Sequence, residues 1–306
     1  MNNSELLFIY DAKMCNPNGD PDEENRPRMD YDRQRNLVSD VRLKRYIRDY
    51  LEENDKDIYV TRVDDKAVTA GDRLKALLHH DATKDDIKEI LSKLIDIRLF
   101  GATMPIKGEK RGAGTSLSLT GPVQFNWGYS LNKVDLVESN GITSEFSGKE
   151  GSDYGTIGKD YRIYYSLIAF HGIVSGKRAL KTNLTEDDLN VLDKSLVKAI
   201  PLQATRSKIG QYPRLYVRLE YTSDEDFIGD LRGYVNLDKT ELLREPTDFA
   251  IDLGRLKDVL ENNTDKIAKI HLWYDREMKF TSNGVSGNVE DLLGEALKIK
   301  TEILNY

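Results

Sequence analysis

The side chains best suited to bind a ligand in this sequence are the cations concentrated between Arg26 and Asp49. Eight positive charges face four negative ones there, although the whole chain carries a formal net charge of −7. Clustered cations can follow a phosphate backbone, each contact releasing counterions without reading the base sequence. A solvated face that keeps the protein in solution is the alternative interpretation, because most charge runs have no other role. In an acidic chain, any nucleic-acid contact is confined to basic stripes.

A second basic segment spans residues 201–218 and contains four cations and no acid. These cations are Arg206, Lys208, Arg214 and Arg218. The accompanying hydroxyl, amide and aromatic groups belong to Thr205, Ser207, Gln211, Tyr212 and Tyr216. Such groups suit a sugar-phosphate chain, and the rings can stack on unpaired bases. Two basic segments converging on one groove would be stronger evidence for RNA binding than either alone.

Carboxylates at positions 20, 22, 23 and 24 are the metal candidate in the sequence, but their spacing does not fit a calcium loop. They form either a solvated acidic turn or a hard-cation site that supports RNA cleavage. The histidines and the single cysteine, Cys15, show no zinc pattern, and we expect Cys15 to be a small buried residue. We therefore predict no catalytic residue, no metal and no cofactor.

The helix that would position the first basic segment is predicted to begin after Ser39. The Ser39 hydroxyl can accept from a backbone N–H, and an aspartate follows at the positive end of the helix dipole. At helical spacing an apolar stripe faces the core, formed by Leu43, Tyr46, Ile47, Tyr50 and Leu51. Lys44, Arg45 and Arg48 lie along one flank of the stripe, and Arg42 lies on the other. We expect the first flank to present three cations in a row to a ribose-phosphate strand.

The rest of the pattern predicts further strands and helices. The strand at 5–13 is apolar on both faces, which indicates a central position in a sheet. Other strands are expected at 58–63, 119–131, 161–174, 214–221 and 267–274. Helices are expected after Thr69, after Thr83 with Gly101 closing it, from Thr185 to Pro201, at 253–260 and at 289–304. Exposed loops are expected at 104–118 and 140–158. In the strand at 214–221, the expected outward residues are Arg214, Tyr216 and Arg218.

Without residues 58–118, the order of elements is strand, helix, strands, helix, strand. This order is typical of the α+β, ferredoxin-like βαββαβ arrangement that RNA-recognition folds also use. We therefore expect residues 1–57 and 119–306 to form this core with a C-terminal elaboration, and residues 58–118 to be an insertion. A chain of 306 residues is long enough for one large domain of this kind.

Composition indicates a packed globular protein, with 39% apolar residues and 16 tyrosines. A single cysteine fits a reducing compartment. No stretch approaches the roughly 18 consecutive apolar residues of a membrane span, and the N-terminus lacks the features of a signal peptide. We expect a soluble cytoplasmic protein without a membrane partner.

Five blocks of the sequence, in order, resemble the signature blocks of a known family. They are NPNGDP at 16–21, SDVRLKRYIR at 39–48, RLFGA at 98–102, TGPVQF at 120–125 with Ser130, and RSKIGQ at 206–211. The family is the Cas-seven backbone subunits of type I CRISPR surveillance complexes (Cascade), and the sequence is most similar to the subtype I-B and I-C branch. The resemblance extends from about Leu6 to Tyr221, and the ordered set is more specific than any one block.

The resemblance implies an RNA-recognition-like palm with inserted finger and thumb elements, assembled in several copies as a helical filament along one CRISPR guide RNA. Base pairing would then recognise the target DNA, while the protein supplies shape and charge and contacts other Cascade subunits. Residues 58–118 would form much of the finger, and the thumb tip would lie within 140–158 or 204–212. The expected RNA contacts are Asn18, Arg42, Lys44, Arg45, Arg48, Lys107, Lys110, Arg111, Gln124, Arg206, Ser207, Lys208 and Gln211.

Two other functions are weighed against this one. Backbone subunits of type III complexes resemble this fold and cleave target RNA with an aspartate near the first helix; Asp20, Asp22 and Asp30 lie within range here. A metal-dependent RNA endonuclease is therefore the main alternative, although the blocks resemble the non-cleaving branch. Self-association with incidental RNA binding is the third hypothesis. We predict a non-catalytic scaffold for the guide RNA.

Overall fold

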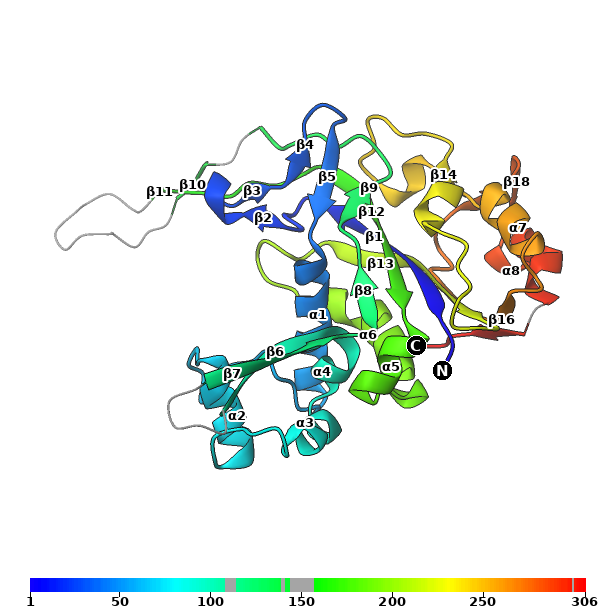
Figure 1. The fold of residues 1–306 in the computed structure, drawn as a ribbon. Helices are drawn as coiled ribbons and strands as arrows, with labels where there is room; N and C mark the ends of the chain where they lie inside the picture. Colours follow the sequence, from blue (N-terminus) through cyan, green and yellow to red (C-terminus); the bar gives the residue numbers. More distant parts are fainter. Residues whose placement is uncertain (108–113, 139–140, 144–156, 299) are drawn as a thin grey trace.

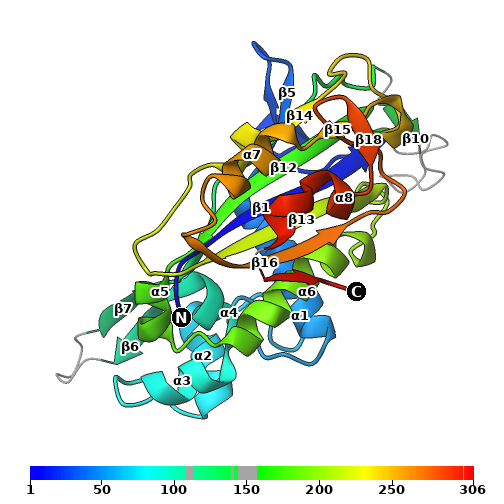
Figure 2. The same ribbon diagram turned by 90° about the vertical axis from the view of Figure 1, so that its right-hand side faces the viewer.

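A computed structural model describes residues 1–107, 114–138, 141–143, 157–298 and 300–306. Within these residues the main sheet has nine strands, in the order β19-β16-β13-β1-β12-β9-β5-β4, with β8 also paired to β12. Helices cover one face of this sheet, and the C-terminal part of the chain covers the other (Figures 1 and 2). The chain is a mixed α+β protein, as the sequence predicts.

The sheet is built around β1 (Ser4–Lys13), in agreement with the central position predicted from its two apolar faces. It pairs antiparallel with β12 (Tyr165–Val174) on one side and with β13 (Gln211–Tyr221) on the other. Leu6 and Phe8 pack in the helical layer, whereas Leu7 and Ile9 pack in the C-terminal layer. Two separate hydrophobic cores therefore meet at the same strand.

The helical layer consists of α1 (Asp40–Glu53), α4 (Ile95–Phe100), α5 (Gly176–Thr182) and α6 (Glu186–Leu202). Helix α6 begins as predicted, because Thr185 and Asp188 form a reciprocal capping box. Pro201 does not end the helix but lies in its last turn. Helix α5, which begins after its N-cap Ser175, was not predicted from the sequence.

The C-terminal layer contains α7 (Gly254–Glu261), α8 (Val289–Leu293) and a second, small sheet. The strands of that sheet are β14 (Asn236–Leu237), β15 (Ile251–Asp252), β17 (Phe280–Ser282) and β18 (Val285–Gly287). Short 3-10 helices lie at Leu231–Tyr234 and Pro246–Asp248. This layer covers the sheet face that carries Leu7 and Ile9.

The C-terminal end departs from the predicted helix at 289–304. Helix α8 ends before Gly294, whose φ of 45° lies in the left-handed region, and a 3-10 helix spans Gly294–Lys298. Strand β19 (Thr301–Ile303) then pairs in parallel with β16 (Ile267–Tyr274). Strand β16 has the bounds that the sequence predicts.

The outward positions predicted for β13 are wrong for Tyr216 and Arg218. Both side chains are fully buried, because the helical layer covers the face on which they lie. Arg218 Nη2 donates to Asp193 of α6 (2.7 Å), and the Tyr216 hydroxyl donates to the same carboxylate (2.6 Å). Arg214 pairs with Asp11 at 2.8 Å. Two arginines of the second basic segment are thus used within the fold.

The segment 58–118, predicted to be an insertion, has its own hydrophobic core, which includes Leu74, Ile90, Ile97 and Met104. It contains α2 (Ala70–Leu78), α3 (Ile87–Lys93), α4, β6 (Gly101–Lys107) and β7 (Gly114–Thr120). The single helix predicted after Thr83 is interrupted at Leu94, which adopts an extended conformation between α3 and α4.

Two further predictions in the insertion are wrong. No strand forms at 58–63, where the described chain shows only an isolated bridge from Val63 to Lys66. The loop predicted at 104–118 is a pair of antiparallel strands, β6 and β7, wherever it is described. Alternation of buried Met104 and Ile106 with exposed neighbours explains the strand, since this period suits a half-buried sheet.

The remaining strands extend the sheet next to β12. The strand predicted at 119–131 is divided into β8 (Val123–Phe125) and β9 (Gly128–Ser130). Strands β5 (Arg35–Val38) and β4 (Met29–Asp30) continue from β9. Strand β2 (Gly19–Asp20) pairs with β3 (Arg26–Pro27), and a 3-10 helix at Pro21–Glu23 lies between them in the chain. A second separate pair is formed by β10 (Gly141–Thr143) and β11 (Ile157–Lys159).

Candidate nucleic-acid interface

Helix α1 carries most of the predicted basic positions, and its start is held by a specific hydrogen-bond network. Ser39 is the N-cap, and its hydroxyl accepts from the Arg42 backbone N–H (3.3 Å). Asn18 Oδ1 accepts from both the backbone N–H and the hydroxyl of Ser39 (2.8 and 3.0 Å). The apolar stripe of α1 is buried as predicted. Asn18 therefore links the turn after β1 to the N-terminus of α1.

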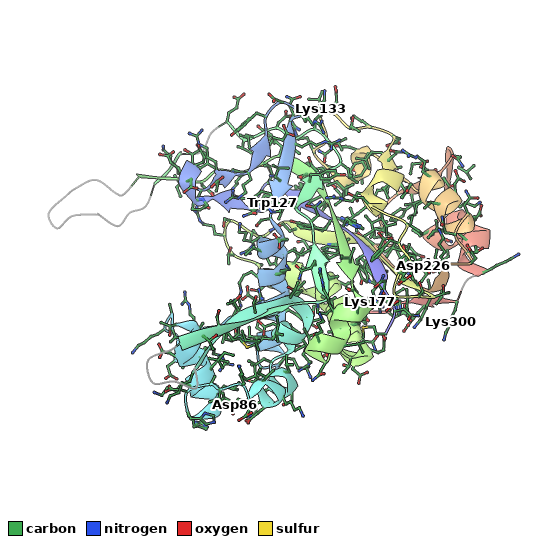
Figure 3. The ribbon with its side chains drawn as sticks, in the orientation of Figure 1. Asp86, Trp127, Lys133, Lys177, Asp226 and Lys300 are labelled. Atoms are coloured by element: carbon green, nitrogen blue, oxygen red, sulfur yellow. The ribbon has the colours of Figure 1, made fainter. Side chains whose placement is uncertain are left out.

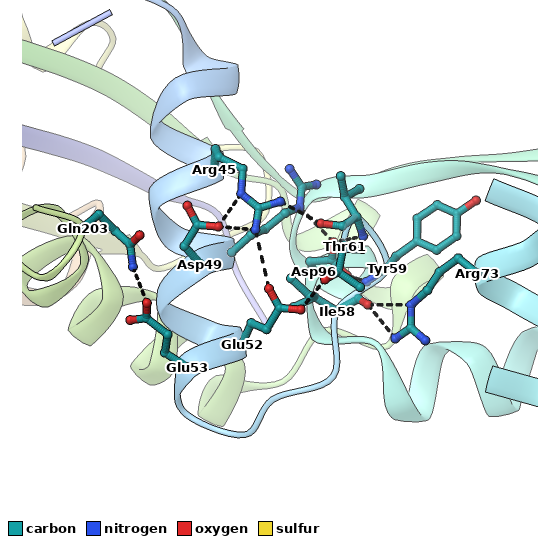
Figure 4. A network of polar contacts seen from close by, with 12 residues as sticks. Arg45, Asp49, Glu52, Glu53, Ile58, Tyr59, Thr61, Arg73, Asp96 and Gln203 are labelled. Carbon is teal, nitrogen blue, oxygen red and sulfur yellow. Dashed lines mark hydrogen bonds and ion pairs between the residues drawn. The ribbon is translucent and has the colours of Figure 1, made fainter. Parts of the chain in front are cut away.

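The flank of α1 formed by Lys44, Arg45 and Arg48, here called the paired flank, is neutralised by the protein's own carboxylates. Lys44 Nζ lies 3.1 Å from Asp40 Oδ2 and donates to Gln124 Oε1 (3.1 Å). Arg45 Nε donates to an oxygen of Asp49 (2.6 Å), as Figure 4 shows. The expectation that this flank presents three free cations in a row is therefore wrong.

Arg48 is the most buried cation of the paired flank. Its Nε donates to Asp96 Oδ2 (2.8 Å), and the two side chains are 12% and 1% exposed. Asp96 also accepts from the backbone N–H groups of Tyr59 and Val60 (2.7 and 3.2 Å), seen in Figure 4. This pair fastens the insertion to α1, because Asp96 belongs to α4 and binds the segment that follows α1.

A concave surface of about 860 Å³ lies beside Arg45, between α1 and residues 60–68. Its charged lining consists of Arg45, Asp49, Glu52, Arg62, Asp64 and Asp65. Carboxylates outnumber cations in this set, so the surface does not attract phosphate. The groove next to the paired flank is therefore a poor site for an RNA backbone.

On the opposite side of α1, Arg42 lies near Lys208 of the loop between α6 and β13, and we call this pair the open flank. Among the described residues neither forms an ion pair. The Arg42 guanidinium lies over the Tyr46 ring, 3.9 Å from its centroid. Lys208 Nζ donates to the backbone oxygens of Asn16 and Pro17 (2.5 and 3.3 Å). Burial, together with the nearby charge of Arg42, lowers the pKa of Lys208 to about 8.

Several buried polar atoms near the open flank have no hydrogen-bond partner within the described structure. They are Tyr10 Oη, Asn16 Oδ1, Arg42 Nε and Gln211 Oε1. Gln211 Nε2 donates to the Tyr46 hydroxyl (3.0 Å) and to the Lys208 backbone oxygen (2.7 Å), which joins these groups into one cluster. Burial raises the pKa of Tyr46, so its hydroxyl stays protonated. Two unpaired cations and unused polar atoms suit an anionic ligand that forms hydrogen bonds.

The other predicted contacts lie on several elements. Arg206 is 64% exposed and lies 3.4 Å from Asp160, and the Ser207 backbone oxygen accepts from the Asn16 N–H (2.9 Å). Lys107 is 68% exposed at the end of β6, 3.7 Å from Asp81. Two predicted contacts, Lys110 and Arg111, lie outside the described residues.

The structure thus brings one group of predicted contacts together at the turn that follows β1. This group is Asn18, Arg42, Ser207, Lys208 and Gln211. Gln124 joins Lys44 instead, on the paired flank. Sequence analysis missed Asn16 and Tyr46 as members of the cluster, although Asn16 opens the first signature block.

The acidic run after the turn is dispersed into separate interactions. Asp20 accepts from the Asp22 backbone N–H (3.2 Å) and from Arg28 Nη1 (2.8 Å). Glu24 accepts from Lys159 Nζ (2.6 Å), and this hydrogen bond lowers the pKa of Glu24. Within the described ranges, no three His, Cys, Asp or Glu side chains gather as a metal ion requires. None of the helices described there is long and apolar enough to cross a membrane.

The chain is thus an α+β protein in which two cations lack a carboxylate partner among the described residues. The sequence matches a family described as CRISPR-associated protein Cas7 over residues 2–254. A curated relative from Haloferax volcanii, named CRISPR-associated protein Cas7, is 36% identical over 301 residues, covering 91% of this chain and 88% of the relative. Because these similarities extend over most of the chain, it belongs to the Cas7 family.

Two solved structures have a similar fold. A chain of a CRISPR RNA-guided surveillance complex in a pre-nicking state has a TM-score of 0.52 and 11% identity, covering 100% of this chain and 97% of that chain. A chain of another CRISPR RNA-guided surveillance complex has a TM-score of 0.51 and 12% identity, covering 99% and 95%. At these identities the likeness shows the fold alone.

Proposed function

We propose that this chain binds a CRISPR guide RNA as a backbone subunit of an RNA-guided surveillance complex, with the open flank of α1 as its phosphate-binding site. The observation that carries this proposal is the pair Arg42 and Lys208, two cations without a carboxylate partner among the described residues. They lie next to the N-terminus of α1, whose free N–H groups favour an anion. Membership of the Cas7 family supports the same function.

A guide phosphate at the open flank would meet complementary chemistry. The Arg42 guanidinium offers a fork of donors, and Lys208 offers a compact charge. Burial disfavours the charged form of Lys208 and lowers its pKa. A bound phosphate offsets this desolvation cost, so binding favours the charged amine. These contacts are made to the backbone and not to the bases, which suits a subunit that carries guides of any sequence.

The paired flank contributes less in this proposal. Lys44, Arg45 and Gln124 line the path of the guide, but Asp40 and Asp49 offset the two charges. Arg48 keeps its buried ion pair with Asp96, so its role is to stabilise the fold and not to contact RNA. Further RNA contacts are proposed for Lys107, Lys110, Arg111 and Arg206.

We propose that the centre of the sheet is a ferredoxin-like, RNA-recognition-like palm. Its elements are β1, α1, β8 with β9, β12, α6 and β13, which follow the βαββαβ order. The antiparallel order β13-β1-β12-β9 and the common face of α1 and α6 support this proposal. Residues 1–57 and 119–306 would form the palm with its elaboration, and residues 58–118 the finger, which has a separate hydrophobic core.

The thumb is assigned to the neighbourhood of residues 140–158. Within the described residues, β10 and β11 pair with each other and with no other strand. Figure 1 draws them away from the main sheet, at the end of the molecule that carries β2 and β3. A strand pair that joins no other strand of the described chain suits an element that contacts a neighbour or displaces a base.

The assembly in this proposal is a helical filament of several copies along one guide RNA. Other Cascade subunits complete it, and the guide pairs with target DNA without catalysis by this chain. The printed names of the two similar structures, both RNA-guided surveillance complexes, support a role within an assembly.

The test of the function is the RNA that the full chain retains when it is co-expressed with a CRISPR array. Wild-type protein should co-purify with repeat-derived RNA of uniform length, and Arg42→Gln with Lys208→Gln should lose most of it. A control removes two cations from the C-terminal layer, Arg255→Gln with Lys266→Gln, and should retain the RNA. Equal RNA content in wild type and both variants would exclude the open flank as the binding site.

The endonuclease alternative has its own test. Wild-type protein is incubated with labelled RNA and Mg²⁺, beside Asp20→Ala and Asp22→Ala. We expect intact RNA in all three reactions. Cleavage by wild type that both variants lose would establish the alternative.

Self-association as the main function is tested by gel filtration with and without guide RNA. The proposal predicts long assemblies only when guide RNA is present. Long assemblies of RNA-free protein would favour self-association instead.

A further inference from the structure

Trp127 is an exposed tryptophan at the turn between β8 and β9. Its exposed fraction is 43%, whereas Trp273, the other tryptophan, packs against the core of the helical layer. Figure 3 labels Trp127 close to the N-terminal end of α1. A buried tryptophan ring contributes strongly to the stability of a fold. A ring that remains half in solvent is instead available for contacts with a ligand.

The backbone that carries Trp127 is held firmly on both sides. The Trp127 N–H donates to Asn126 Oδ1 (2.8 Å), and the Trp127 backbone oxygen accepts from Arg232 Nη1 (2.7 Å). Gly128 follows, and a Cβ there would lie 2.5 Å from the Phe170 ring, so the chain packs too closely for any other residue. The exposed ring therefore stands on a rigid support.

The surroundings of the ring are those of a stacking site. The Arg28 guanidinium lies over the Trp127 ring, 5.6 Å from its centroid, and is itself paired with Asp20 at 2.8 Å. The next ring on the same strand, Tyr129, is already contacted by Arg35 and Arg232 at 5.0 and 4.3 Å. Arginine and aromatic side chains beside an exposed indole are the groups on which unpaired bases stack.

The residue after Trp127, Gly128, pairs with Val38, which directly precedes Ser39 at the start of α1. The Arg28 backbone N–H donates to the Asn18 backbone oxygen (3.1 Å). The Asn18 side chain in turn holds Ser39, the N-cap residue three positions before Arg42. Trp127 and Arg42 are therefore both connected to the N-terminal end of α1.

We propose that Trp127 is a stacking platform for an unpaired nucleobase of the strand bound at the open flank. This inference rests on the proposed function and adds a base-dependent but sequence-independent contact to the phosphate contacts. Stacking is sequence-tolerant because every base has a π-face. The open flank then positions the RNA backbone, and Trp127 orients one base by stacking.

The test compares two RNAs of equal length, one with ordinary bases and one with abasic riboses, in equilibrium binding to the full chain. Wild-type protein should prefer the base-bearing RNA by roughly tenfold. Trp127→Ala should reduce that preference to less than about threefold and leave the affinity for abasic RNA unchanged. Trp127→Phe should restore most of the preference, because it keeps a ring. An unchanged preference in Trp127→Ala would overturn the inference.

The same two RNAs separate this inference from the proposed function. Arg42→Gln should weaken binding of both RNAs by the same factor. If wild type binds neither RNA, the proposed function fails; if Arg42→Gln weakens both while Trp127→Ala changes nothing, only the platform fails.

Fluorescence identifies which strand supplies the base. In a Trp273→Phe background, the remaining emission of Trp127 should be quenched when single-stranded guide RNA binds. Quenching that appears only after a DNA target is added would contradict the proposal, because the base would then come from the DNA and not from the strand at the open flank. Equal quenching by abasic and base-bearing RNA would contradict stacking.

Discussion

The cations on the two sides of α1 lie in opposite electrostatic environments. On the paired flank, Lys44 and Arg45 each face an aspartate on the same helix, and Arg48 is buried against Asp96. On the open flank, Arg42 and Lys208 have no such partner among the described residues, and Lys208 has a pKa of about 8.

The difference teaches that the number of cations does not measure the capacity to bind phosphate. A cation that already has a carboxylate must give it up, whereas a desolvated cation without one gains from any anion. The open flank has fewer cations than the paired flank, but each of them gains more electrostatic free energy from a bound anion. The predictions below compare the two flanks, from the largest expected effect to the smallest.

The largest effect is expected from Arg48→Met, and it should fall on stability. This change leaves Asp96 buried without its cation, which costs about 3 kcal/mol of unfolding free energy. Urea unfolding of the full chain measures it, with Arg45→Met as the matched variant of an exposed pair. Arg45→Met should cost less than about 1 kcal/mol. Equal losses in the two variants would show that Arg48 has no special structural role.

The second effect is a pH dependence that belongs to the open flank. Guide RNA affinity should fall several-fold as the pH rises from 7 to 9, because Lys208 loses its proton near pH 8 in the free protein but keeps it beside a bound phosphate. Lys208→Arg stays charged and should remove this dependence. A wild-type affinity that is flat across this range would contradict the assignment of Lys208.

The same group affects stability with a definite sign. The pKa of Lys208 is near 8 in the folded chain and near the model-compound value of 10.5 in the unfolded chain. Between these values the unfolded chain binds more protons, so stability should rise with pH through this window. Lys208→Met should lack this rise in a series of thermal unfolding measurements.

The third and smallest effect is a gain of binding on the paired flank. Asp49→Asn removes the carboxylate that Arg45 Nε contacts at 2.6 Å and should raise guide affinity about threefold. Glu53→Gln is the matched control, because Glu53 bonds to Gln203 and to no cation in the described structure (Figure 4). Identical gains in both variants would indicate a general charge effect, and no gain would show that Asp49 does not restrain Arg45.

Much of the fold was predictable because its signals are local. Ser39 and Thr185 cap their helices as predicted, the stripe of α1 is buried, and the two-faced apolar pattern of β1 marks a central strand. The wrong predictions concern residues whose burial depends on elements that are distant in the sequence. Tyr216 and Arg218 alternate like outward residues but lie under α6, and their partner Asp193 sits on that helix.

The site was predicted only in part, for the same reason. The partners of Lys44 and Arg45 lie four residues away on the helix, so this spacing was visible in the sequence. Asp96 lies 48 residues after Arg48 in the chain, so this pair could not be anticipated. The convergence of Arg42 with Lys208 depends on β13 lying beside β1. The predicted fold brought the two basic segments to one face, but only the structure shows which of their cations meet.

The most direct test of the central claim is the salt dependence of guide RNA binding. The slope of log affinity against log salt is measured for two double variants, Arg42→Gln with Lys208→Gln and Lys44→Gln with Arg45→Gln. Removing the open flank should flatten the slope by about 1.4, or two contacts at about 0.7 each for a single strand, while removing the paired flank should change it by less than about 0.5. The reverse order of effects would place the phosphate contacts on the paired flank and contradict this account.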